Sequence, residues 1–222
     1  MQKSVYSIVL SDDVVTMIDR LAYRNNTNRS NMINQILAEY VSYVTPEKRM
    51  QDTIRRVEAI LGGADTFQVL MQPTDSTLTV RSAIAYKYNP SVRYAIELYR
   101  TYGDAVGELR VSLRSQNSSL LLYLSQFFRL WMGLEAAYLP QLDCHMEDGR
   151  LTRRLRPTRV HGIGPVIREL SSESLGDLLY GYIDAFDRAL KSFFYMLDTP
   201  AAATAEIERI YRDYLSSHEI VL

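Results

Sequence analysis

The N-terminal fold is decided by residues 3–44, which read KSVYSIVLSDDVVTMIDRLAYRNNTNRSNMINQILAEYVSYV. The stretch opens with a run whose side chains alternate between two faces, Val5, Ser7 and Val9 on one and Tyr6, Ile8 and Leu10 on the other. Alternation with a period of two predicts a β-strand. No partner strand follows nearby, and an isolated strand leaves its backbone N–H and C=O groups unpaired. We therefore predict that this strand pairs with the same strand of a second copy of the chain.

Two helices are predicted after the strand. Ser11 and the carboxylates of Asp12 and Asp13 form a helix-start signature, because the hydroxyl can accept from a backbone N–H and the acids favour the positive helix end. Apolar residues then recur at the three- and four-residue spacing of an amphipathic helix, namely Val14, Val15, Ile18, Leu21 and Ala22. A second helix is predicted from Arg29, with an inner face of Met32, Ile33, Ile36, Leu37, Tyr40, Val41 and Val44.

The order and spacing of these elements resemble the ribbon-helix-helix family, the small dimeric DNA-binding proteins that include the Arc, MetJ and CopG-type repressors. The residues that carry the resemblance are Tyr6–Asp13, Ile18–Ala22 and Asn28–Asn34, within about the first fifth of the chain. The resemblance implies a homodimer whose paired strands lie over four helices and enter the major groove of DNA as a two-stranded ribbon.

The same resemblance assigns DNA contacts. The ribbon face that meets the bases consists of Lys3, Val5, Ser7 and Val9. Ser7 can donate to or accept from a base, whereas the two valines offer only apolar contact, for instance with thymine methyl groups. At the start of the second helix, Asn28, Arg29, Ser30 and Asn31 are expected to present backbone N–H groups and the positive dipole end to a phosphate. A typical member of the family carries more polar side chains on its ribbon.

The charge of this segment leaves alternatives open. Through Thr45 there are four basic residues (Lys3, Arg20, Arg24, Arg29) and four acidic ones (Asp12, Asp13, Asp19, Glu39). A neutral segment lacks the electrostatic footprint of many DNA binders. The main hypothesis is a sequence-specific bacterial transcriptional regulator, such as a repressor. The alternatives are a plasmid or mobile-element accessory protein acting in partition or DNA transfer, a non-DNA-binding interaction protein that uses the segment only to dimerise, and a chance pattern at the edge of a larger α/β domain.

The composition of the 222-residue chain is that of an ordinary globular protein, with 47% hydrophobic and 23% charged residues and a net charge of −1. One cysteine, Cys144, fits a reducing compartment, and the N-terminus shows no signal-peptide pattern, so a cytoplasmic protein is expected. The most apolar window, Leu120–Leu139, is interrupted by polar residues. It therefore predicts a buried helix rather than a membrane span.

An α+β fold is predicted overall, with a DNA-binding and dimerisation domain over residues 1–45, a helical connector over 46–63 and an α+β domain over 64–222. The connector is either a rigid arm or the first helix of the last domain. Alternating runs over 78–87, 92–99 and 109–114 predict a three-stranded antiparallel meander with one buried face, which the later helices cover. This domain is expected to hold an effector site or a further oligomer interface.

Two groups of basic residues in this domain have more than one interpretation. The polar face of the meander carries Arg81, Lys87, Arg93, Arg110 and Arg114 against Glu97. It either binds phosphates or another anion, or, as we favour, is a solvated face balanced by acids on the neighbouring loops. Residues 150–159 are predicted to be an irregular loop containing Arg150, Arg153, Arg154, Arg156 and Arg159. These arginines either bind phosphate or, slightly favoured, pair with the acidic C-terminal helices.

No catalytic or cofactor motif is recognisable. Glycine-rich phosphate loops and nucleophile elbows are missing from the sequence. The available metal ligands are Cys144, His145, Glu147, Asp148, His161 and His218, and their spacing is not that of a metal site. We therefore predict a protein that is not an enzyme, with no cofactor, no metal and no membrane partner. Its expected partners are double-stranded DNA, a second copy of the chain or a higher oligomer, and an unidentified effector.

Overall fold

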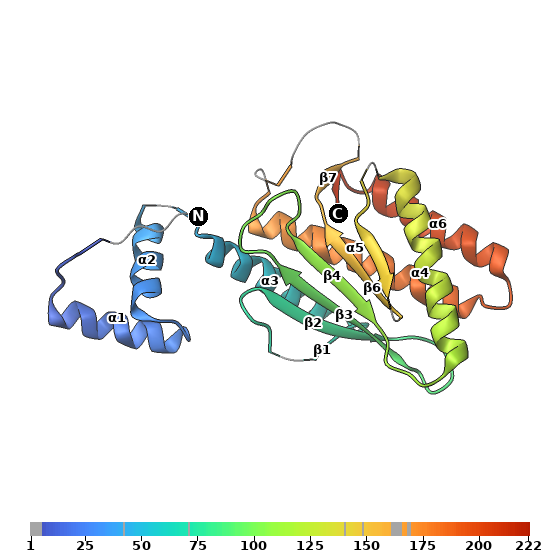
Figure 1. Cartoon of the computed structure of the whole chain (residues 1–222), viewed down its shortest axis with the longest axis horizontal. Helices are drawn as coiled ribbons and strands as arrows, with labels where there is room; N and C mark the ends of the chain where they lie inside the picture. The colour runs from blue at the N-terminus through green and yellow to red at the C-terminus, as the bar shows by residue number, and fades with distance from the viewer. Residues whose placement is uncertain are drawn as a thin grey trace. The chain divides into compact units, whose positions relative to one another are not determined.

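The computed structural model describes residues 6–41, 43–70, 72–139, 141–147, 149–160, 166–167 and 170–222 (Figure 1). Two of the predicted ribbon residues, Lys3 and Val5, lie outside this part of the chain. The chain divides into two compact units, Met1–Arg49 and Met50–Leu222. Each unit is described by itself below.

The first unit contains the two predicted helices, α1 (Asp12–Arg24) and α2 (Arg29–Tyr40). Both begin where the sequence indicates, but the two starts differ in detail. Asn28 caps α2 through its side chain, which accepts from the backbone N–H of Asn31 at 2.9 Å. Ser11 precedes α1 without a side-chain cap, so the hydroxyl bond predicted there is wrong. The second helix also ends before Val44, which lies beyond its last turn.

The predicted ribbon strand is not formed within the single chain. Residues 6–10 are described, carry no regular secondary structure and are exposed, so the first regular element of the described chain is a helix. An intermolecular ribbon needs the backbone of a second copy to satisfy its N–H and C=O groups. The ribbon therefore stays a prediction.

The second unit begins within α3 (Pro46–Gly63), the predicted connector. From Met50 onward the apolar stripe of this helix lies in the core of the second unit, and Ile54, Val57 and Leu61 are almost fully buried there. Thr53 on the same helix donates to the carbonyl oxygen of Ser172 at 3.3 Å. Most of α3 is thus the first helix of this unit.

The core of the second unit is a six-stranded antiparallel sheet with the order β1-β2-β3-β4-β6-β5. Its strands are β1 (Gln68–Val69), β2 (Thr77–Ala83), β3 (Ser91–Leu98), β4 (Gly107–Ser112), β5 (Cys144–Glu147) and β6 (Arg150–Leu155). The helices that follow are α4 (Ser118–Tyr138), α5 (Ser172–Tyr195) and α6 (Pro200–Ser216), and a small ribbon joins β7 (Thr158–Arg159) to β8 (Ile220–Val221). The α+β class is confirmed.

The predicted meander is confirmed as β2, β3 and β4. Its apolar residues alternate as expected, and Val80, Tyr94 and Val111 stand side by side on the buried face. Strand β2 ends at Ala83, earlier than predicted. Lys87 therefore lies in the turn between β2 and β3 and not on the sheet face.

The β5–β6 hairpin corrects the prediction of an irregular loop over residues 150–159. Strand β6 pairs with β4 on one side and β5 on the other. Its buried positions are Leu151, Arg153 and Leu155, so an arginine occupies a place where a period-two pattern needs an apolar residue. Because Arg153 interrupts the apolar alternation, the sequence pattern does not predict the strand.

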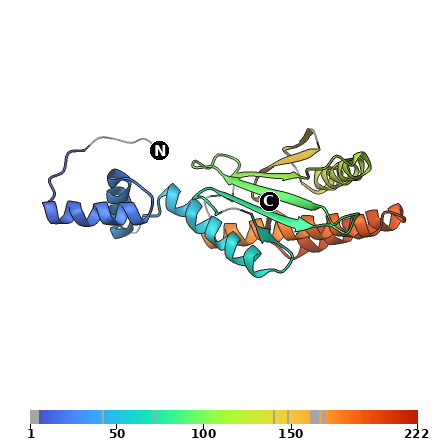
Figure 2. The same cartoon turned by 90° about the horizontal axis from the view of Figure 1, so that it is seen from below.

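Helices α3, α5 and α6 lie on one face of the sheet, below it in Figure 2. Aromatic residues fill the space between sheet and helices, centred on Phe186, whose ring lies 5.0 Å from that of Trp131 and 5.3 Å from that of Phe127. As predicted for the apolar window, α4 is a helix with a buried face. Among the helices of the described chain, none is both long and apolar enough to cross a bilayer.

Candidate nucleic-acid interface

The predicted phosphate-binding segment lies at the start of α2. Asn28, Arg29, Ser30 and Asn31 are all exposed there. Because Asn28 caps the helix, the N–H of Asn31 already has an acceptor. The N–H groups of Arg29 and Ser30 belong to the first turn, where a helix offers no acceptor of its own. A phosphate at this end would therefore meet two backbone donors and the positive end of the dipole.

Arg29 has a partner that the sequence analysis missed. Its Nε and Nη2 atoms donate to the two carboxylate oxygens of Asp19 on α1, at 2.7 and 2.6 Å. This hydrogen bonding lowers the pKa of Asp19 and raises that of Arg29. The pair holds the guanidinium at the helix start but also neutralises its charge. The two residues lie ten positions apart in sequence, so no local pattern predicts the pair.

On the ribbon segment, Ser7 and Val9 are exposed, and Val9 is exposed over 99% of its surface. The neighbouring residues Tyr6, Ile8 and Leu10, predicted to face the helices, are exposed as well. The structure of the single chain does not bring these residues together with the start of α2 into one described contact surface. The prediction brings them together only in a dimer.

The first unit leaves most of its apolar side chains uncovered. Ile18, Ala22 and Met32 form a small core, with Ile33 packed against it. Exposed apolar residues remain along both helices, and we call them together the exposed apolar surface: Val14, Met17 and Leu21 on α1, Ile36, Leu37 and Tyr40 on α2, and Val41 just after it. All of them except Met17 belong to the predicted stripes. So many exposed apolar residues on a small unit favour an interaction site, because large apolar patches on soluble proteins commonly mark one.

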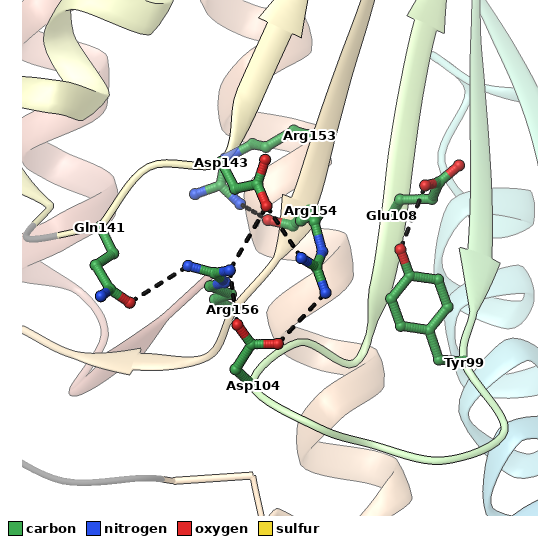
Figure 3. Close-up of polar contacts among 8 residues, drawn as sticks. All are labelled: Tyr99, Asp104, Glu108, Gln141, Asp143, Arg153, Arg154 and Arg156. Atoms are coloured by element: carbon green, nitrogen blue, oxygen red, sulfur yellow. Dashed lines mark hydrogen bonds and ion pairs between the residues drawn. The ribbon is translucent and has the colours of Figure 1, made fainter.

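In the second unit, the arginine-rich segment forms a closed ionic cluster (Figure 3). Arg154 and Arg156 both contact Asp104, at 3.3 and 2.6 Å, and both contact Asp143, at 3.2 and 3.5 Å. Arg156 also donates to Gln141 at 3.3 Å. Asp104 lies between β3 and β4, and Asp143 just before β5. Arg154 and Arg156 thus pair with acids, but the prediction that their partners lie on the C-terminal helices is wrong, because Asp104 and Asp143 lie in loops beside the sheet.

Arg153 points the other way, into the core. Its Nε lies 2.8 Å from Glu135 Oε1 on α4, a distance typical of an ion pair although the N–H is not aligned for a hydrogen bond. Its Nη2 donates to the carbonyl oxygen of Leu222 at 2.6 Å, and its guanidinium lies 4.6 Å from the ring centre of Tyr182. Tyr182 in turn donates to Glu135 at 2.9 Å.

The charges of this buried pair depend on each other. Burial raises the pKa of Glu135 above its usual value, and the charge of Arg153 offsets only part of that effect. Burial opposes the charge on Arg153, but attraction to Glu135 keeps its pKa above the usual value. Arg153 therefore connects β6, α4 and the chain end and is not available to a phosphate. The one signal in the sequence was Glu135, an acid within an apolar helix.

The described residues include no group of three His, Cys, Asp or Glu side chains close enough to hold a metal ion. Two of the candidate ligands, Asp148 and His161, lie outside the described residues. Burial raises the pKa of the Cys144 thiol to about 12, so the thiol is protonated at neutral pH. A protonated thiol is a poor nucleophile and a poor metal ligand.

Comparisons of the chain with models of known protein families, with characterised proteins and with solved structures find no match. The function is therefore argued from the residues themselves. The helix start with its Asp19–Arg29 pair and the exposed apolar surface of the first unit are chemically suited to binding, the first to an anion and the second to an apolar partner.

Proposed function

We propose that the protein is a homodimeric transcriptional regulator that binds duplex DNA through an N-terminal ribbon-helix-helix module. The observation that carries the proposal is the exposed apolar surface on a pair of helices preceded by the alternating run Tyr6–Leu10. A second copy supplies what both features need. It covers the apolar side chains of α1 and α2, and it pairs the strand groups that a single chain leaves open.

In this proposal the ribbon reads bases through Lys3, Val5, Ser7 and Val9. The start of α2 holds a backbone phosphate through Asn28, Arg29, Ser30 and Asn31, which fixes the register of the ribbon in the groove. Asp19 positions the Arg29 side chain at this end through its two hydrogen bonds. The second unit serves as an effector or oligomerisation domain, and the protein acts by binding rather than by catalysis.

The experiment that tests this function measures retention of labelled genomic duplexes, including the promoter of the protein's own gene, across a salt series. Ser7→Ala is expected to reduce the preference for the best duplex, because it removes the polar group that contacts a base. Arg29→Ala is expected to weaken binding to all duplexes, because a phosphate contact carries no sequence information. Arg55→Ala is the matched control, since Arg55 is an exposed helix residue of the second unit. Failure to retain any duplex at low salt would contradict the proposal.

A second candidate is an interaction protein that uses the module for dimerisation only. Two observations favour it, namely the apolar Val9 on the ribbon and the neutralisation of Arg29 by Asp19. The same experiment separates the two candidates, because a dimer that retains no DNA fits only the second. A plasmid or mobile-element accessory protein would share the DNA-binding result and would differ in the origin of the preferred duplex.

A further inference from the structure

The six-stranded sheet of the second unit has one face that α3, α5 and α6 do not cover. Side chains alternate along each strand, so that Val80, Val92 and Val111 are buried while Arg81, Arg93 and Arg110 are exposed. In Figure 2, helices α3, α5 and α6 lie on the other side of the strands. We call the uncovered side the open face.

Strand register places three arginines in one row across the open face. Arg81 on β2 is directly opposite Arg93 on β3, Arg93 is opposite Ser112 on β4, and Ser112 is opposite Arg150 on β6. We call these four residues the arginine row. Side chains directly opposite each other lie about 5 Å apart at Cβ, and like charges in such positions destabilise a sheet. Repulsion between Arg81 and Arg93 therefore lowers the stability of the sheet. A face with no role beyond contact with solvent does not require such a pair.

The row differs from the other arginines of the same face because no carboxylate of the described chain forms an ion pair with it. Arg110 pairs with Glu97 at 3.0 Å and also contacts Glu108, while Arg154 contacts Asp104 and Asp143. Arg81 donates only to the neutral side chain of Gln68, at 2.8 and 2.6 Å.

The other two arginines of the row are Arg93 and Arg150. Within the described chain, their side chains make neither a hydrogen bond nor an ion pair. Glu147 stands opposite Arg150 in register without forming an ion pair with it. The row is therefore a line of positive charge with free donors.

We propose that the arginine row binds the phosphate backbone of duplex DNA. Arginine suits this ligand because its planar fork of N–H donors matches phosphate oxygens. The row spans three strand spacings, about 14 Å, which is comparable to the rise of about four phosphates along one DNA strand. Ser112 adds a hydroxyl donor in the middle. This inference rests on the proposed DNA-binding function and adds a second, sequence-independent contact to it.

Two other occupants fit the face less well. Single-stranded nucleic acid is held by aromatic side chains on which bases stack, and no Phe, Tyr or Trp points outward from the described residues of β2, β3, β4 or β6. A second copy packed face to face would place its own uncompensated arginines near this row, and such like-charge contact is unfavourable. Duplex DNA, a rigid polyanion, is attracted by every positive charge in the row.

The test compares the full-length protein with a double variant, Arg93→Ala with Arg150→Ala. The matched control is Arg55→Ala with Arg129→Ala, which removes two exposed arginines of α3 and α4 that also lack a polar partner in the described chain. Affinity for a labelled duplex is measured between about 50 and 200 mM salt, the range over which phosphate contacts lose affinity. The row variant is expected to lower the salt slope by about two for each protomer whose row contacts DNA, and so by about four for a dimer that uses both rows, equally on all sequences, while the control keeps the wild-type slope.

Three outcomes overturn the inference. If the wild-type protein binds DNA and the row variant keeps its slope, the row does not contact DNA, although the proposed function stands. If the row variant loses binding of inorganic pyrophosphate but keeps its DNA slope, the row belongs to a small anionic ligand. If the wild-type protein retains no duplex at low salt, the proposed function and this inference fail together.

Discussion

At the scale of single residues, the second unit is organised by polar side chains buried in an apolar core. Glu135 is fully buried with Arg153, and Asp187 on α5 accepts from the Tyr94 hydroxyl at 2.8 Å and from that of Ser82 at 3.1 Å. Buried charges are costly unless they are paired and hydrogen-bonded. Each of these acids ties a helix to the sheet, so its removal affects the contact between layers.

The first prediction concerns the pH dependence of Glu135. Its folded-state pKa is raised, mainly by burial, so the folded state binds this proton more tightly than the unfolded chain does. The contribution of Glu135 to stability is fully present below about pH 4, the unfolded value, and is lost as the pH rises through the folded-state pKa. The unfolding free energy of the wild type minus that of Glu135→Gln should therefore fall as the pH rises toward 7. Urea denaturation at several pH values measures it, and a difference that grows with pH would contradict the assignment.

The second prediction concerns Asp187. The Asp187→Ala change leaves two buried hydroxyls without their acceptor and Lys191 without its ion-pair partner at 2.7 Å. We expect a loss of about 3 kcal/mol in the free energy of unfolding. Asp184→Ala on the same helix is the control, because Asp184 pairs with Arg188 at the surface and should cost much less. If chemical denaturation gives the same loss of unfolding free energy for both variants, the buried hydrogen bonds of Asp187 contribute no more to stability than the surface ion pair of Asp184.

At the scale of elements, the register of two paired strands depends on the positions where their backbones can approach each other closely. Gly107 opens β4 opposite Leu98, and a Cβ atom added to it would lie 2.3 Å from the carbonyl oxygen of Glu97. The approach requires glycine, since backbone atoms on both sides of the contact are fixed by the ladder. This position therefore sets how β3 and β4 start their pairing.

The third prediction is that Gly107→Ala destabilises the second unit by about 1–3 kcal/mol, the usual cost of forcing an extra methyl group into a filled site. The control is Gly103→Ala in the loop between the same two strands, where an added Cβ meets nothing within 4 Å. Thermal unfolding of both variants tests this. The structural account fails if the Gly103 variant is the less stable of the two.

At the scale of the whole molecule, the first unit is too small to cover its own apolar residues. Leu37 on α2 is exposed over 56% of its surface, and Tyr40 over 88%. If a second copy covers these residues, as proposed, the stability of the unit should depend on protein concentration. This is the physical basis of the proposed homodimer.

The fourth prediction is that Leu37→Glu shifts the full-length protein from dimer to monomer, because it places a charge within the apolar surface that the second copy covers. Leu122→Glu on α4 is a close control, since Leu122 is exposed over 55% of its surface but lies in the second unit. Sedimentation velocity over a range of concentrations reports the mass of each. A monomeric wild type, or a Leu37→Glu variant that stays dimeric, would contradict this surface as the dimer contact.

The sequence by itself determined the elements whose patterns are local. The two N-terminal helices and the meander of β2, β3 and β4 follow from periodicity and end signals within a few residues. It also pointed to the residues proposed for DNA binding.

Only the tertiary structure decided the contacts between residues far apart in sequence. Arg29 with Asp19, Arg153 with Glu135 and the hairpin of β5 and β6 all depend on partners that the linear pattern does not mark. The sequence alone predicts that an arginine lies at the surface, because nothing local marks the buried acid that pairs with it, and the pattern of β6 therefore predicts a loop. The arginine row likewise exists only through strand register, because hydrogen bonds between strands, not sequence neighbours, bring Arg81, Arg93 and Arg150 together.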